Sequence, residues 1–371
     1  MSKFIFILAG GVAAAGVALA APGAPDGALA ILRDVQSGCG LPPGKNTTVA
    51  SRDELLKVVR CARDGTTIYL KPNSYGEIDL RGRLGLRLTA ASRNKLPVLT
   101  GMRILGSQDI SIDHLIFQGD PSGLQYRLLV QNSSNVKVGF LNFPGATGTS
   151  DPPILSAVFL RSSNSIQFSD SEIAWNRHGI SFLNVNDTVL SRNYLHNLQT
   201  DGIRGGGASR LLVEGNYITS FHPVHPDHPD GIQLWSTQQT ESAHDIKILD
   251  NLITRGSGLM TQGIFVRDTF EHLPFKNMEI RGNTVVGTMW NGIAVRGIEG
   301  GLIENNQVLA MPDQKSWIRI TLAKDTTVRG NVAQEVNVDP TVHSVENKLR
   351  LLSDTQRASA IRVALAHLGR G

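Results

Sequence analysis

The densest group of side chains that could do chemistry lies in the ten residues 221–230. This segment contains three histidines, two aspartates and three prolines. Histidine titrates near neutral pH, and a neighbouring carboxylate can fix its tautomer and orientation. Proline restricts the backbone, so these side chains should be held in place. The segment therefore predicts a site for general acid/base chemistry.

Within this segment we expect His228 to be the proton-transfer residue, because Asp227 and Asp230 flank it and a predicted strand follows directly. His225 is the second candidate, since it lies three residues away and could act on the opposite face of a bound substrate. His222 is expected to contact the substrate.

Two alternatives to this interpretation stay open. The same histidines and aspartates could ligate a metal ion, although their spacing matches no established zinc pattern. The segment could also be a proline-stiffened surface loop with solvated polar residues. We predict no metal and no cofactor, because nothing in the sequence indicates a bound divalent cation such as calcium.

The elements that position this segment follow a regular repeat. Asn193 precedes Gly202 by 9 residues and Asn283 precedes Gly292 by 9, and each of these glycines precedes the next repeat asparagine by 14. A fixed period of 23 residues is typical of a solenoid whose units cannot bury their apolar faces alone. The Gly-Ile pairs of the repeat are Gly179-Ile180, Gly202-Ile203, Gly231-Ile232, Gly263-Ile264 and Gly292-Ile293.

The pattern within one repeat predicts short parallel strands. Apolar and polar residues alternate at 165–168, 210–213, 245–248 and 277–280, and Asn and Gly bound these runs. Asn tolerates a left-handed bend, and its amide can bond to the Asn one coil away. We therefore predict an all-β, right-handed parallel β-helix of about nine coils at residues 66–336. An internal ladder should contain Asn193, Asn216, Asn251, Asn283, Asn306 and Asn331.

The ends of the chain carry other signals. Lys3 and the apolar run 4–20 predict a cleaved signal peptide at 1–20, and hence export to the periplasm or the medium. Residues 21–65 should form a cap with a helix at 51–63, which Ser51 opens. The cysteines Cys39 and Cys61 predict a disulfide in an exported protein. Residues 337–371 are predicted to be a C-terminal helical tail or a cap for the other end.

Three insertions interrupt the repeat and mark the face on which function should lie. Asn216 to Gly231 takes 15 residues rather than 9, and two later segments take 20 rather than 14. If the repeat isoleucines point inward, alternate residues on the same strands point outward. These are Arg204, Gln233 and Trp235, with Arg267 and Arg296 in the column of Trp235 and Asp268 beside them.

A row of guanidinium groups beside an exposed Trp suits an anionic sugar chain, because arginines pair with carboxylates and aromatic faces pack on sugar rings. Solvated arginines paired with Asp268 or Glu299 are the structural alternative. His178 and Asp201 precede repeat glycines, so they are weaker catalytic candidates whose stacking could be structural, and we assign them to substrate contacts.

Charge sets limits on the partners. The formal net charge of +4 becomes +3 after cleavage, since Lys3 is the only charged residue before position 21. Basic residues do not cluster, so nucleic acid is not implied. We expect an anionic polysaccharide partner, no membrane contact after cleavage, and a monomer.

These coils resemble the pectate-lyase-like superfamily, which holds polysaccharide lyases, mannuronan C5-epimerases and polygalacturonase-type hydrolases. Residues 227–230, Asp-His-Pro-Asp, are similar to the Asp-Pro-His-Asp motif of the epimerases with His and Pro transposed. Residues 263–268 resemble the later Gly-Ile strand that carries their substrate-carboxylate arginine, which implies this role for Arg267.

The resemblance implies a polysaccharide lyase that acts by β-elimination on a uronic-acid polymer such as alginate. A C5-epimerase with the same site is the first alternative. Residues 199–203 resemble the Asn-Thr-Asp-Gly strand of polygalacturonases, but the adjacent Asp-Asp pair and the Arg-Ile-Lys strand are missing. A hydrolase and a non-catalytic polysaccharide-binding or surface β-helix are the remaining alternatives.

Overall fold

The computed structural model describes residues 46–62, 64–120, 123, 125–145 and 154–370. The chain divides into two units, Met1–Gly40 and Leu41–Gly371, of which the first lies outside the described residues. The predicted signal peptide and Cys39 therefore lie outside the described residues, and so does Arg63, the last residue of the predicted helix. Export and the Cys39–Cys61 disulfide stay predictions.

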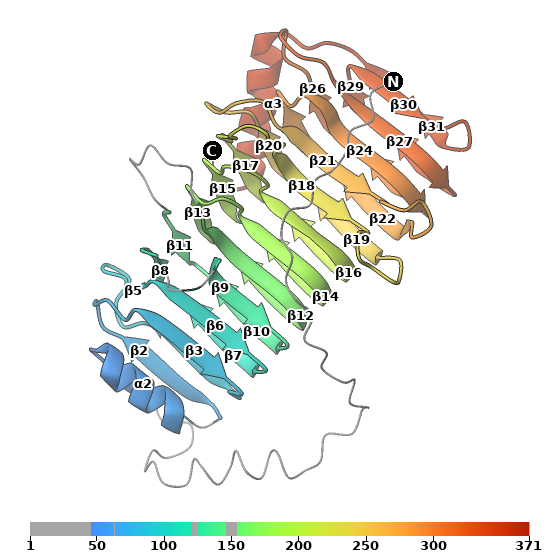
Figure 1. Cartoon of the computed structure of the whole chain (residues 1–371). Coiled ribbons are helices and arrows are strands. Elements are labelled where there is room, and N and C mark those ends of the chain that lie inside the picture. Colours follow the sequence, from blue (N-terminus) through green and yellow to red (C-terminus); the bar gives the residue numbers. More distant parts are fainter. Residues whose placement is uncertain (1–45, 63, 121–122, 124, 146–153, 371) are drawn as a thin grey trace. The chain divides into compact units, whose positions relative to one another are not determined.

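The second unit is a stack of parallel strands in three rows (Figure 1). The first row contains β3 (Glu77–Arg81), β6 (Gly101–Leu105), β9 (Tyr126–Gln131), the first halves of β12 (Ser156–Ser169), β14 (Ile180–Ser191) and β16 (Ile203–Glu214), β18 (Asp230–Trp235), β21 (Gln262–Arg267), the first parts of β24 (Trp290–Glu299) and β27 (Ser316–Lys324), and β30 (Glu335–Val338).

The second row contains β1 (Thr47–Val49), β2 (Thr66–Leu70), β4 (Leu86–Ala90), β7 (Gln108–Asp113), β10 (Ser134–Gly139), the second halves of β12, β14 and β16, β19 (His244–Leu249), β22 (Phe275–Arg281), β25 (Leu302–Glu304), β28 (Thr327–Arg329) and β31 (His343–Val345). The third row contains β5 (Val98–Leu99), β8 (Ile116–Phe117), β11 (Asn142–Phe143), β13 (Glu172–Ala174), β15 (Tyr194–His196), β17 (Tyr217–Thr219), β20 (Leu252–Thr254), β23 (Thr284–Val286), β26 (Gln307–Leu309), β29 (Val332–Ala333) and β32 (Lys348–Leu349).

The predicted right-handed parallel β-helix is confirmed. Each strand pairs in parallel with the strand one coil away, for example Ile180 with Ile203 and Ile203 with Ile232. In the described part of the chain the third row has 11 strands, so the stack is longer than the nine coils predicted. Ten of these strands lie within the predicted range 66–336, and β32 lies beyond it.

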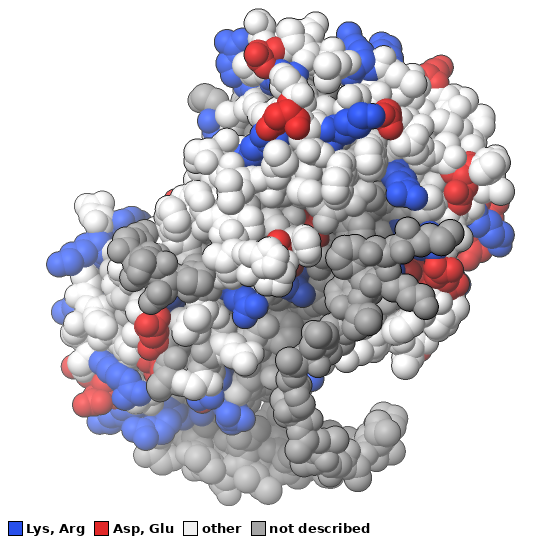
Figure 2. Space-filling view, turned by 45° about the horizontal axis from the view of Figure 1, so that its top comes forward, with Lys and Arg blue, Asp and Glu red and all other residues white. Residues whose placement is uncertain are grey.

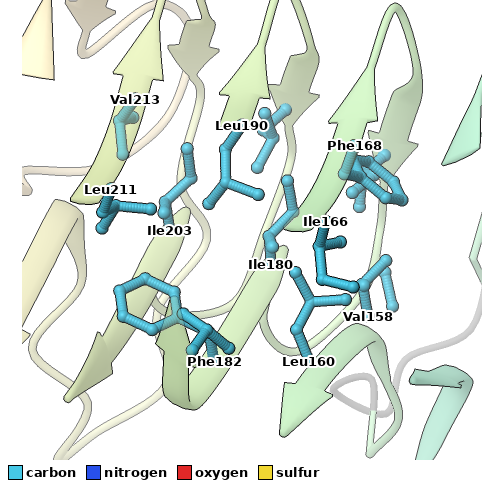
Figure 3. Packing of buried hydrophobic residues seen from close by; sticks show 14 of the residues in the cluster. Val158, Leu160, Ile166, Phe168, Ile180, Phe182, Leu190, Ile203, Leu211 and Val213 are labelled. Atoms are coloured by element: carbon cyan, nitrogen blue, oxygen red, sulfur yellow. The ribbon is translucent and has the colours of Figure 1, made fainter. Parts of the chain in front are cut away.

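Stacked apolar side chains fill the space between the rows. Val158, Ile180 and Ile203 come from successive coils and point into the same interior, as Figure 3 shows. All three have 0% exposure, and burying a side chain of this size contributes about 1.5–3 kcal/mol. Steric crowding explains why a glycine precedes each repeat isoleucine. A Cβ on Gly231 would lie 2.7 Å from Cγ2 of Ile253 in the third row.

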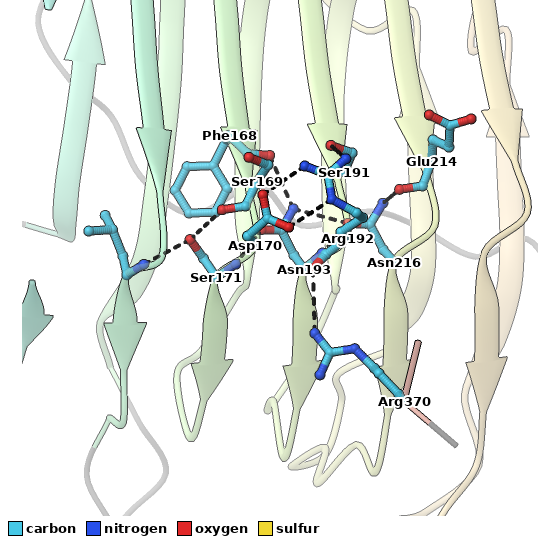
Figure 4. A network of polar contacts seen from close by, with 11 residues as sticks. Phe168, Ser169, Asp170, Ser171, Ser191, Arg192, Asn193, Glu214, Asn216 and Arg370 are labelled. Atoms are coloured by element: carbon cyan, nitrogen blue, oxygen red, sulfur yellow. Dashed lines mark hydrogen bonds and ion pairs between the residues drawn. The ribbon is translucent and has the colours of Figure 1, made fainter. Parts of the chain in front are cut away.

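Buried asparagines join the coils at the corner between the second and third rows. Oδ1 of Asn216 accepts the backbone N–H of Asn193 at 3.0 Å, and Asn216 itself donates its backbone N–H to Asn251. The six predicted members are confirmed, and Asn347 extends the ladder. In the preceding coil Ser171 occupies the ladder position (Figure 4), rather than Asp170, which pairs with Arg192 instead.

The two helices have different roles. α2 (Arg52–Cys61) begins after the N-cap Ser51, and its buried Leu55 and Val59 join the core at the N-terminal end of the stack (Figure 1). Of the predicted tail, β31 and β32 continue the coils, and α3 (Asp354–His367) begins after Ser353 with a capping box. Neither described helix has the length and apolar character that crossing a bilayer requires.

Of the two expectations for residues 337–371, a tail or a cap, α3 fits a helical tail. The helix packs beside β20 and β23 of the third row. Arg357 is buried and donates to the carbonyl of Ala310 at 3.2 Å, while Arg370 reaches the carbonyl of Arg192. The helix therefore lies along the side of the stack, because the acceptors of both arginines lie in earlier coils.

Removing one ladder residue should destabilise the fold. Asn216→Ala leaves the backbone N–H and side-chain amide of Asn193 without their acceptor, and each unsatisfied buried donor costs about 1–3 kcal/mol. We expect the free energy of unfolding, measured by urea denaturation, to fall by about 3 kcal/mol. Asn186→Ala, an exposed change on the neighbouring β14, should cost less than about 0.5 kcal/mol. Equal losses in the two variants would contradict a structural ladder.

Candidate functional site

The insertions flank two strands of the first row. Loops 220–229 and 255–261 precede β18 and β21, and loops 236–243 and 268–274 follow them. Long connections thus lie at both ends of these two strands. On one face of the molecule, Figure 2 shows Lys and Arg interspersed with Asp and Glu over the C-terminal coils.

The outward columns predicted on this face are confirmed by the register. Arg204 pairs with Gln233, and Trp235, Arg267 and Arg296 occupy one column on three successive coils. Equivalent residues on neighbouring coils are about 4.8 Å apart. The Arg204 guanidinium also lies over the Trp235 ring, 4.9 Å from its centroid. The two columns therefore form one continuous surface along the stack.

Two buried carboxyl groups lie at the start of these strands. Asp201 and Asp230 are 3% and 0% exposed. Asp201 accepts a hydrogen bond from the backbone N–H of Asp230 at 2.9 Å and pairs with Arg204 at 2.9 Å. Gln233 donates its side-chain amide to Asp230 at 2.5 Å, and Nη1 of Arg204 lies 2.6 Å from Nε2 of His178. We call these five residues the carboxyl–arginine network.

Burial gives the two carboxyl groups different protonation states. Burial first, and the charge of Asp201 second, raise the pKa of Asp230 well above its ordinary value. Burial also raises the pKa of Asp201, but the charge of Arg204 opposes this shift. The proton therefore belongs on Asp230, while Asp201 stays paired with Arg204. Oδ1 of Asp230 is buried and has no hydrogen-bond partner among the described residues. Strongly shifted carboxyl groups of this kind are typical of functional sites.

His178 is held neutral in this network. Burial, followed by the charges of Arg204 and Arg177, lowers the pKa of His178 to about 3. Since Nε2 accepts from Arg204, the proton lies on Nδ1, which donates to Oγ of Ser156 at 2.8 Å. With both ring nitrogens engaged, His178 can position Arg204 but has no free lone pair with which to take a proton.

A groove rich in arginine continues from this network along the first row. Arg267, Arg296 and Arg319 line a cavity of about 190 Å³, together with Phe265 and Asn291. We call it the arginine groove. Arg296 also pairs with Glu271, rather than with the Asp268 or Glu299 considered from the sequence. An anionic ligand in this groove would meet three cationic side chains against one carboxylate.

The three histidines of the inserted loop 220–229 do not form one cluster. His222 stacks on Trp175 at 5.2 Å and lies 3.2 Å from Oδ1 of Asn197, toward the third row. His225 and His228 are exposed, and within the described residues no hydrogen bond or ion pair joins them to the carboxyl–arginine network. Asp227, by contrast, accepts from Gln199 at 2.6 Å, and its charge acts on Asp201.

Asp268, expected to contact substrate, has a structural role in the described contacts. It is 1% exposed, accepts from Oγ of Ser236 at 2.8 Å, and accepts the backbone N–H of Leu273 at 2.8 Å. These bonds hold the loop 268–274 against the end of β18. The carboxylate is therefore already satisfied by its own chain.

Sequence reasoning missed Ser156 and Arg319. Both lie on coils without a Gly-Ile pair, since Val158 and Trp317-Ile318 occupy the corresponding positions. Buried Ile318 and Ile320 alternate with Arg319 in the sequence. This alternation could have predicted that Arg319 points outward, in the same column as Gln233. Across the described residues, no group of three or more His, Cys, Asp or Glu is arranged to hold a metal ion.

The protonation of Asp230 predicts an unusual pH dependence. The folded state keeps a proton that the unfolded chain releases above about pH 4, so this group costs stability as the pH rises through that window up to the raised pKa. Asp230→Asn removes the cost. We expect the urea midpoint of the variant, minus that of the wild type, to be larger at about pH 7 than at about pH 4.

The control for this experiment is Asp325→Asn, because that carboxylate is 75% exposed. Its midpoint difference should be the same at both pH values. A midpoint difference for Asp230→Asn that does not change with pH would show that Asp230 is ionised in the folded protein.

Comparisons with known proteins agree with the architecture. The family model described as a right-handed beta helix region matches residues 153–308. No curated protein matches the sequence. The similar solved structures include a mannuronic-acid-specific family 6 polysaccharide lyase from human gut microbiota (11% identity, 87% of this chain and 94% of that chain covered, TM-score 0.51). They also include the DFA-IIIase of Arthrobacter chlorophenolicus A6 with GF2 (13%, 89% and 90%, 0.52) and the surface adhesin PfbA of Streptococcus pneumoniae (11%, 86% and 86%, 0.49).

At these identities the likeness concerns the fold. The repeat, the parallel register and the family model agree on it. The chain is therefore a right-handed parallel β-helix.

Proposed function

We propose that this chain is a polysaccharide lyase that cleaves an anionic, uronic-acid-containing polysaccharide by β-elimination. The observation that carries the proposal is the line of arginines on the outer face of the first row. Arg204 lies over Trp235, and Arg267, Arg296 and Arg319 follow in the arginine groove. Guanidinium groups match carboxylates bidentately, and an aromatic ring offers a face to a sugar.

The chemistry of β-elimination explains why cations are needed there. The C5 proton of a uronate becomes acidic only when the charge of its carboxylate is neutralised. Arg267 is our preferred partner for that carboxylate, because it neighbours Trp235 in register on the next coil. Loss of the C5 proton then forms the C4–C5 double bond and expels the oxygen on C4.

His228 is our preferred base for this step, with His225 second. His178 cannot serve, since Arg204 and Ser156 engage both of its ring nitrogens. The imidazole of His228 is exposed on the loop that leads into Asp230. After taking the C5 proton, the imidazolium could return it to the leaving oxygen, so no further acid is required. Asp201 and Asp230 would position Arg204 and Gln233 beneath the sugar.

The comparisons support a carbohydrate substrate without deciding the reaction. The similar structures with a TM-score above 0.5 are named a mannuronic-acid-specific lyase and a DFA-IIIase in complex with GF2. A C5-epimerase would use the same site, with re-protonation from the opposite face in place of elimination. Export and a monomeric state belong to this proposal.

One observation favours a glycoside hydrolase as the second candidate. Hydrolysis needs a protonated carboxyl group near an ionised one, and Asp230 and Asp201 supply such a pair. Both carboxyl groups are buried, however, so a sugar could reach them only if the residues that cover them moved. The arginine line needs no such movement, which is why we rank the lyase first.

The substrate test is incubation with alginate, pectate and glycosaminoglycans while absorbance near 235 nm is recorded. We expect absorbance to rise on at least one polyuronate, because elimination creates an unsaturated sugar end. Arg267→Gln should lower kcat/KM about tenfold to a hundredfold, since a charge-assisted hydrogen bond contributes about 1.5–3 kcal/mol. Arg281→Gln, an exposed change on the second row, is the matched control and should leave kcat/KM unchanged.

Other results would identify the alternatives. Flat absorbance with a changed uronate ratio in the proton NMR spectrum means an epimerase. New reducing ends without absorbance mean a hydrolase. No change in any polyuronate would contradict the proposed enzyme.

The role of His228 has its own test. His228→Ala should lower kcat by about 10²–10⁴-fold with folding intact, as expected for loss of a general base. His343→Ala, an exposed histidine on the second row, serves as the control. If His228→Ala keeps full activity and His225→Ala does not, the base is His225; if both keep it, the inserted loop is a structural insertion.

A further inference from the structure

An exposed phenylalanine occupies a strained backbone position on another part of the stack. Phe140 has φ of 53° and is 54% exposed. It lies at the corner directly before the ladder position of its coil. In the other coils the same corner is held by glycine, asparagine or aspartate at Asp170, Gly215, Asp250, Gly282, Asn305 and Gly330, and by larger polar residues at His114, Arg192 and Glu346.

Phe140 differs from the other residues at this corner because its side chain is both large and apolar. Glycine, asparagine and aspartate adopt the left-handed conformation readily, whereas a bulky side chain there is an outlier that costs stability. Burial does not offset the cost at Phe140, because half of its side chain faces solvent. Strain that packing does not explain is a reason to look for a binding role.

Phe140 lies at the edge of a groove whose polar lining residues are joined by hydrogen bonds and ion pairs. The His114 ring stacks on it, with centroids 4.7 Å apart and planes 20° apart. The groove has a volume of about 210 Å³ and is also lined by Arg87, Asp113 and Lys137. Asp113 bonds to Thr89, pairs with Arg87 at 3.0 Å, and lies 2.7 Å from Nδ1 of His114.

Charge indicates which ligand the groove suits. Arg87, Arg93 and Lys137 surround the single carboxylate of Asp113, so the groove keeps positive charge after its internal pairs are made. Lys137 is exposed and, within the described residues, forms no ion pair. A cation beside an aromatic face suits a sugar that carries a carboxylate.

We propose that this groove is a second, non-catalytic site for a uronate unit, with the sugar ring against Phe140 and its carboxylate near Lys137 and Arg87. The site lies on strands of the second row, whereas the arginine groove lies on the first. It deepens the proposed function and rests on it for the substrate class, since one polymer could contact both sites. It needs no turnover, so its test is independent of the lyase activity.

The test compares two asparagine substitutions at left-handed positions. Phe140→Asn removes the aromatic face and suits the backbone, so its urea midpoint should stay at or above that of the wild type. Leu322→Asn is the matched control, because Leu322 has φ of 50° and is 43% exposed far from this groove. Binding is measured by affinity electrophoresis in gels that contain alginate or polygalacturonate, with a neutral polysaccharide gel as reference.

We expect Phe140→Asn to weaken binding to one polyuronate about tenfold, while Leu322→Asn binds like the wild type. Both variants should keep wild-type rates on short uronate oligomers. The proposal is overturned if Phe140→Asn binds like the wild type, if the wild type is not retarded by either polyuronate, or if the neutral gel retards it equally. A parallel loss of rate on short oligomers would also overturn it, since the groove would then belong to the catalytic site. Normal retardation without any absorbance change would contradict the lyase alone and leave this site standing.

Discussion

Hydrogen bonds between successive coils hold Asn193, Asn216 and Asn251 in one buried line, and the register of the neighbouring strands depends on that line. Each amide accepts a backbone N–H from the coil before it and donates into the coil after it, so a coil cannot slip without leaving buried donors unpaired. Residues that act together in this protein therefore lie on neighbouring coils, and the strand register sets the distances between them. The spacing of the arginines is a consequence of the same register.

The same stacking explains how two acids can be buried side by side. Asp201 and Asp230 occupy equivalent positions on neighbouring coils, so the register alone brings them together. Two charges there would repel each other in a dry environment, and the pair is tolerated because Asp230 keeps its proton while Arg204 neutralises Asp201. Arg204 is in turn oriented by His178 and held over Trp235. Groups that a sugar would not touch thus hold the half-buried side chain of Arg204 in place over Trp235.

Sequence reasoning could predict what the repeat encodes. The period gave the parallel register, the ladder and the outward columns of Arg204, Trp235 and Arg267, because alternation and stacking are local rules. The period could not predict which side chains are buried in the segments where insertions interrupt the repeat. His228 and Asp230 are two residues apart, yet one is exposed and the other fully buried. His178 and Asp201 looked structural because they precede glycines, and only the three-dimensional contacts show that they form the support of Arg204. The path of α3 along the third row depends on distant carbonyl partners that no local pattern encodes.

We propose that a uronate chain binds along the first row, from the carboxyl–arginine network into the arginine groove. A crystal structure of the His228→Ala variant with a bound uronate oligomer tests it most directly. We expect sugar rings against Trp235, with carboxylates within hydrogen-bond distance of Arg267 and at least one of Arg296 and Arg319. An oligomer bound elsewhere on the stack, with these arginines still facing solvent or their own acidic partners, would contradict it.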